Sequence, residues 1–161
     1  MKVRIVVASQ SEADFYEAEQ RGMPPRFVQR LEDADARLHD RDLKSDRPGR
    51  VFDHAAAPGG RRGAVAHHST GGERSPRKVE ARRFARRVTE ALEEARRQGQ
   101  YDRLVIMAPP AFLGLLREEM PAAVQAMLSA EIGKELVHEP PEALTEYLPP
   151  GTFTRHPIAA D

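Results

Sequence analysis

The fold class is decided by the stretch RLVIMA at residues 103–108. Its four central residues form an apolar run without a polar interruption, which is typical of a strand buried on both faces of a sheet. Pro109 and Pro110 follow directly and end the strand, because proline has no N–H to donate to a neighbouring strand. Such strands occur where helices cover a sheet, so the stretch predicts an α/β fold.

The strongest helix signal precedes this strand, over residues 76–98. Apolar side chains recur there every three or four residues and form one stripe, while arginine and glutamate cover the other face. The stripe consists of Ala81, Phe84, Ala85, Val88, Ala91, Leu92 and Ala95. Ser75 can cap the first amides, Pro76 suits the first helical position, and Gly99 suits the far end. A second helix is expected at residues 111–120.

The N-terminal third is predicted to be a β-meander. Residues 3–8 are apolar and rich in β-branched side chains, residues 13–18 can return as a second strand, and residues 27–31 alternate as a third. Together with the buried strand, these segments predict one α/β domain over residues 1–148, with a mixed β-sheet and flanking helices.

The sequence pattern does not settle the secondary structure of the C-terminal third. Residues 124–137 are compatible with a helix and also with a last strand, and periodicity does not choose between them. A short helix is expected over residues 141–148, followed by a flexible tail over residues 149–161.

Composition excludes several classes of site. The chain has 161 residues and no cysteine, so disulfides, thiolate nucleophiles and cysteine-ligated zinc are ruled out. His67 and His68 are adjacent and lack the spacing of a metal site, so neither a metal nor another cofactor is expected. The apolar run at residues 3–8 is too short for a signal peptide or a membrane span, which predicts a cytoplasmic protein without a membrane partner.

The charges are unevenly distributed although the formal net charge is zero. Residues 61–87 carry nine basic and two acidic side chains, whereas residues 118–161 carry eight acidic and two basic ones. Residues 55–75 are rich in glycine, arginine and histidine and nearly free of large apolar side chains, so we expect a mobile insertion there. The basic middle of the chain predicts an anionic partner.

Several segments resemble the bacterial host attachment protein family. The most specific of them is RDLKSDRPGR at residues 41–50, followed by Phe52 and Asp53. Further matching segments are residues 83–85, 101–105, 108–110, 112–114, 116–117 and 134–136. The resemblance therefore extends over nearly the whole chain.

That family is similar to the central domain of archaeal and eukaryotic release factors and of the ribosome-rescue factor Pelota. In release factors, a Gly-Gly-Gln loop before a long helix promotes hydrolysis of peptidyl-tRNA. Gly71, Gly72 and Glu73 lie in the corresponding place here. The resemblance implies a release-factor-like fold and makes Glu73 the candidate catalytic residue. Because a carboxylate replaces the glutamine amide, we expect the chemistry to be lost or changed.

Candidate phosphate-binding residues lie in the insertion and in the charged loop before it. Arginine and lysine neutralise phosphates, and glycine allows the backbone to approach closely. These candidates are Arg61, Arg62, Gly71, Gly72, Arg74, Arg77, Arg41, Lys44, Arg47 and Arg50. Both groups have a structural alternative. The insertion can be a solvated segment without a partner, and the loop cations can pair with Asp42 and Asp46.

The sequence therefore favours a protein that binds tRNA, rRNA or the ribosome through its Gly/Arg-rich loop, with little or no catalysis. Two alternatives stay open. One is a cytoplasmic interaction or regulatory protein that is needed indirectly for attachment to host cells. The other is a hydrolase that uses Glu73 or the loop histidines.

Overall fold

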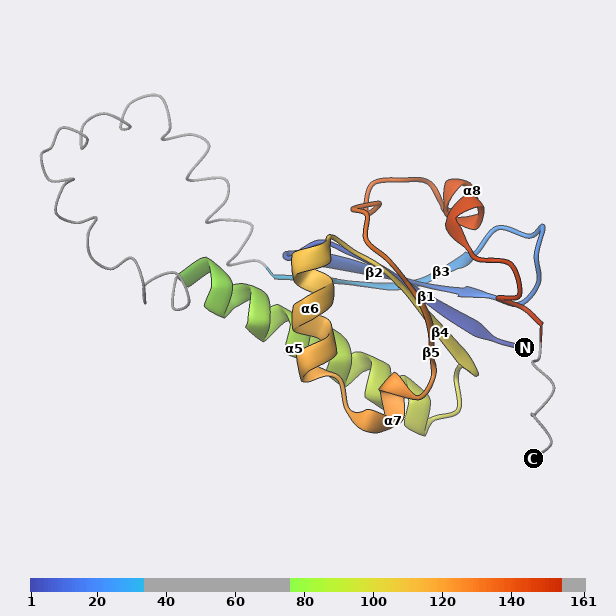
Figure 1. Cartoon of the computed structure of the whole chain (residues 1–161). Helices are drawn as coiled ribbons and strands as arrows, with labels where there is room; N and C mark the ends of the chain where they lie inside the picture. Colours follow the sequence, from blue (N-terminus) through green and yellow to red (C-terminus); the bar gives the residue numbers. More distant parts are fainter. Residues whose placement is uncertain (34–75, 155–161) are drawn as a thin grey trace, which may run out of the picture.

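A five-stranded mixed sheet forms the centre of the molecule (Figure 1). The computed structural model describes residues 1–33 and 76–154, and the strand order in the sheet is β3-β2-β1-β4-β5. The strands are β1 (Val3–Ala8), β2 (Glu12–Ala18), β3 (Arg26–Glu32), β4 (Arg103–Met107) and β5 (Leu128–Ile132). The first three pair antiparallel, whereas β1 with β4 and β4 with β5 pair parallel. The prediction of one α/β domain with a mixed sheet is confirmed.

The predicted meander is present, and its two turns have clear causes. After β1, the Ser9 hydroxyl accepts hydrogen bonds from the amides of Ser11 and Glu12, both at 3.2 Å, which closes the first turn. Gly22 takes a φ of 96° between β2 and β3, a conformation that favours glycine. The pairing of β2 with β3 shifts register between Phe15 and Tyr16, so β3 carries a bulge.

Helices cover the two faces of the sheet unequally (Figure 1). One face carries α5 (Pro76–Arg97), α6 (Pro110–Glu119) and α7 (Ala122–Gln125). Among the described residues, the other face carries α8 (Pro141–Leu144) and the 3-10 helix η1 (Thr145–Tyr147), with the segments around them. The side chains of β4 alternate between these two cores, so this strand is buried on both faces as predicted.

Helix α5 has the predicted apolar stripe, with Pro76 and Gly99 at its two ends as predicted, whereas the predicted cap Ser75 lies outside the described residues. Phe84, Val88 and Leu92 are fully buried against the sheet. Pro76 is the first helical residue, and Gly99 has a φ of 69° just beyond the last turn. The Gly99 amide donates to the Arg96 carbonyl and the Gln100 amide to the Ala95 carbonyl, which is a Schellman cap.

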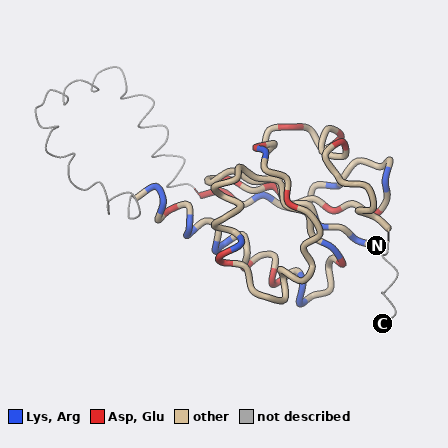
Figure 2. The backbone as a smooth tube through the Cα atoms, viewed as in Figure 1, with Lys and Arg blue, Asp and Glu red and all other residues tan. Residues whose placement is uncertain are grey.

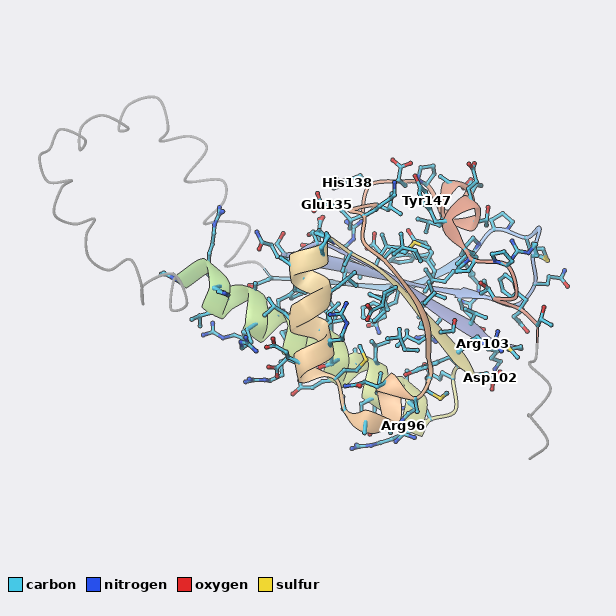
Figure 3. The ribbon with its side chains drawn as sticks, viewed as in Figure 1. Arg96, Asp102, Arg103, Glu135, His138 and Tyr147 are labelled. Carbon is cyan, nitrogen blue, oxygen red and sulfur yellow. The ribbon has the colours of Figure 1, made fainter. Side chains whose placement is uncertain are left out.

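The C-terminal third contains both a helix and a strand, the two alternatives that the sequence left open. Residues 122–125 form one helical turn, α7, and residues 128–132 form the edge strand β5. The predicted last helix is divided, because its second half winds as the 3-10 helix η1. The segment assigned to a tail makes contacts with the body up to Phe153. Arg103, labelled in Figure 3, donates to the carbonyls of Gly151 and Thr152, both at 2.7 Å.

Three predicted segments lie wholly or partly outside the described residues. They are the Gly/Arg/His-rich insertion at 55–75 and the charged loop at 34–50, together with the end of the tail at 155–161. In the part of the chain that is described, no helix is long and apolar enough to cross a membrane.

Candidate anion-binding surface

The first half of α5 is strongly cationic. Residues 76–87 carry six basic side chains and one acidic one. The apolar stripe of the helix turns toward the sheet, so the basic residues between its members turn outward. Figure 2 shows Lys and Arg recurring along this half of the helix. We define the basic strip as Arg77, Lys78, Arg82, Arg83, Arg86 and Arg87.

The acidic end of α6 neutralises the middle of the basic strip. Arg82 Nη1 lies 2.8 Å from Glu118 Oε1 and 3.2 Å from Glu119 Oε2, and Arg86 Nε lies 3.0 Å from Glu119 Oε1. The hydrogen bond from Arg86, with that from Arg82, lowers the pKa of the Glu119 carboxyl. Part of the charge asymmetry seen in the sequence is therefore balanced within the molecule.

Arg83 and Arg87 differ in their surroundings. Arg87 donates to the Glu32 carbonyl at 3.0 Å, and its guanidinium lies 5.6 Å from the centroid of the Phe84 ring. Arg83 is exposed and makes no hydrogen bond or ion pair with any residue that the structure describes. Its charge is not compensated by a described neighbour, which is the condition for attracting an external anion.

A groove of about 410 Å³ runs between α5 and α6 beside the basic strip. We call it the α5–α6 groove. Its apolar lining is Ala81, Ala111, Phe112, Gly114 and Leu115, and its polar lining is Gln10, Arg77, Lys78, Arg82 and Glu118. We call the apolar lining residues the floor of the groove and the charged ones its rim, and this combination suits a ligand with a planar apolar part and negative charge.

The α5–α6 groove lies at a favourable edge of the sheet. Gln10 follows the C-terminal end of β1, and Ala111 follows that of β4, so the groove is at the carboxyl ends of two adjacent parallel strands. From this edge, the chain continues from β1 to β2 on one side and from β4 through α6 to β5 on the other. Ligands of α/β sheets commonly bind at such a switch point.

The opposite face offers less for binding. Glu135, His138 and Tyr147 lie near α8, away from the basic strip (Figure 3). Lys134 Nζ lies 5.8 Å from the centroid of the Tyr147 ring. Within residues 1–33 and 76–154, no group of three or more histidine or carboxylate side chains is placed to hold a metal ion.

Most of the predicted site residues are not described. Of the ten phosphate-binding candidates, Arg77 lies in α5 and lines the groove. The candidates outside the described residues are Arg41, Lys44, Arg47, Arg50, Arg61, Arg62, Gly71, Gly72 and Arg74, and Glu73 also lies there. Sequence reasoning did not single out Lys78, Arg82, Arg83 or Arg86. The spacing of four between Lys78, Arg82 and Arg86 was a usable signal, because it places them on one helix face.

Comparison with known proteins supplies a family. A family model described as "Protein required for attachment to host cells" matches residues 4–148. The match includes the whole sheet except Val3, all of the described helices, and the residues that line the groove. No curated protein matches the chain.

Proposed function

The chain belongs to the family of proteins required for attachment to host cells, and from this we propose that it acts in attachment by binding RNA. The partner would be tRNA, rRNA or the ribosome in the cytoplasm, and the surface would be the basic strip. Its effect on attachment would then be indirect. The protein would influence how other proteins are made and would not itself touch the host cell.

The observation that carries this proposal is Arg83, an exposed cation in the middle of the basic strip, between Arg82 and Arg86, which are paired with Glu118 and Glu119. Cations along a helix can contact the phosphates of a nucleic acid backbone, and phosphate neutralisation supplies most of non-specific RNA affinity. Arg83 adds a charge that no described residue balances. Arg77 continues the strip to the helix start.

The resemblance to release factors extends the proposal to the segment before α5. If this domain is a divergent release-factor central domain, Gly71, Gly72 and Arg74 would reach the same RNA as the strip, because they directly precede the helix. Arg61 and Arg62 would add phosphate contacts to the same RNA. Glu73 would then be a contact residue in place of a catalytic one.

The proposal is tested with the full chain and a labelled single-stranded RNA, by fluorescence anisotropy over a range of salt concentrations. Wild-type affinity should fall steeply with salt. Arg83→Glu should weaken binding and lower the slope of log K against log salt by about 1, the value for one lost phosphate contact. Since Arg83 is exposed, its replacement should leave the unfolding temperature nearly unchanged.

Lys2→Glu is the matched control. It makes the same change in net charge at an exposed position next to β1, at the end of the sheet opposite to the start of α5 (Figure 1). We expect this variant to bind RNA like the wild type at every salt concentration. Equal losses in the two variants would mean that only net charge matters, and absence of salt-dependent binding by the wild type would refute the proposal.

The two other hypotheses, a regulatory protein and a hydrolase, differ in the support that they have. An interaction or regulatory role without RNA is compatible with the family's description, and it would be favoured if the wild type bound no RNA. A hydrolase that uses Glu73 or the histidines of the insertion gains no support, because those residues lie outside the described part of the chain.

A further inference from the structure

We propose that the α5–α6 groove receives one unpaired nucleotide of a single-stranded RNA, with its base on the apolar floor and its phosphates at the cationic rim. This inference rests on the proposed function and specifies the RNA it would take. It distinguishes a single strand from a duplex, which the charge of the basic strip alone does not do.

The shape and lining of the groove suit a base and not a phosphate alone. Its volume of about 410 Å³ is within the roughly 300–1,000 Å³ of small-molecule sites. Ala81, Phe112 and Leu115 form an apolar floor, and such a surface gains nothing from a bare inorganic anion. The side-chain amide of Gln10 has both a donor and an acceptor for the edge of a base.

The charges explain why the ligand would be a nucleotide. Arg77 and Lys78 contribute positive charge to the rim, whereas the third cation, Arg82, is ion-paired with Glu118 and Glu119. The rim continues along α5 into the exposed Arg83, so the backbone of a strand can follow the helix while one base enters the groove. In a duplex the bases are stacked and paired, and their faces cannot reach an apolar floor.

Substitution of Gly114 tests whether the groove binds RNA. It lies in α6 and lines the groove, and a Cβ added at this position would meet no atom within 4 Å. A side chain at this position therefore starts in open space beside the groove. Replacing glycine within a helix also favours the helix, so loss of folding is not the expected result.

The experiment compares wild type, Gly114→Ala and Gly114→Leu as full-length proteins. Each is titrated into a labelled single-stranded RNA and, separately, into a blunt RNA duplex of the same length. Gly114→Leu should weaken single-strand binding by at least about fivefold, as expected for the lost contact of one base, and Gly114→Ala should weaken it less. Neither substitution should change binding to the duplex, which uses the basic strip alone.

Ala123→Leu is the control for added apolar bulk, because Ala123 is exposed in α7 and does not line the groove. The inference is overturned if Gly114→Leu binds the single strand like the wild type, or if the wild type binds duplex and single strand equally. It is also overturned if adenosine monophosphate competes as well as the strand does. Loss of binding in Arg83→Glu with no effect of Gly114→Leu would leave the proposed function intact and reject the groove alone.

Discussion

Each face of the sheet carries a buried apolar core, but the two faces are covered in different ways. One is covered by the 22-residue helix α5 together with α6. The other is covered by the four-residue helix α8, the 3-10 helix η1 and the segments around them, which place Leu136, Leu144 and Leu148 on the sheet. Complete burial therefore does not require a long helix. It requires a few apolar side chains at the right places, and a long helix adds an outer surface that is free for binding.

The largest expected effect comes from the helical face. Phe84 is fully buried, and its ring stacks on that of Phe112 with centroids 6.0 Å apart. Phe84→Ala should lower the free energy of unfolding by about 3–5 kcal/mol. Urea denaturation measures this loss. Val79→Ala, on the same helix but 47% exposed, should stay within about 0.5 kcal/mol of the wild type. A loss of less than about 1 kcal/mol for Phe84→Ala would contradict the account of this core.

A smaller effect is expected on the other face. Leu144 is also fully buried, but it belongs to a helix of four residues. A short element can shift toward the space that the truncated side chain leaves, so Leu144→Ala should cost about 2–3 kcal/mol, near the lower end for such substitutions. The same urea titration tests it. If Leu144→Ala lowered the free energy of unfolding more than Phe84→Ala does, the short segments around α8 would be more rigid than helix α5.

The smallest effect concerns a hydrogen bond between Tyr101 and the backbone of α5. The Tyr101 hydroxyl donates to the Leu92 carbonyl at 3.0 Å, and burial raises the pKa of Tyr101 to about 12. The folded state therefore favours neutral Tyr101, whose contribution is complete below about pH 10 and is lost as the pH rises toward 12. Tyr101→Phe should cost about 0.5–1.5 kcal/mol at pH 7 and should reduce the alkaline loss of stability.

Thermal unfolding of wild type and Tyr101→Phe at neutral and alkaline pH measures this difference. The guanidinium of Arg4 lies 5.7 Å from the centroid of the Tyr101 ring and is itself buried, so it is kept unchanged in both proteins. If the variant lost as much stability at alkaline pH as the wild type, a group other than Tyr101 would titrate in that pH range.

The helical face was predictable because its signals are local. The stripe of α5, Pro76 at its start and Gly99 at its end can all be read within one segment, and the apolar run of β4 is continuous. The opposite face was not predictable in the same way. Leu136, Val137 and Leu144 stand apart among acidic residues and prolines, with no periodicity to assign them to a core.

Short elements also limited the prediction for residues 124–137. Helix α7 has four residues and β5 has five, and neither is long enough to display a period of 3.6 or 2. At the candidate site, the basic character of α5 was visible in the sequence. The pairing of Arg82 and Arg86 with Glu118 and Glu119 was not, because it depends on how α6 packs on α5.

The bulge in β3 bears on how the protein behaves at high concentration. Among the described residues β3 is an edge strand, and a straight apolar edge would offer its backbone N–H and C=O groups to other molecules. The register shift interrupts that regular row, and the charged side chains of Arg26, Arg30 and Glu32 are exposed along it. We therefore expect this edge to resist the addition of strands from neighbouring copies, even though Phe27 is 50% exposed on it.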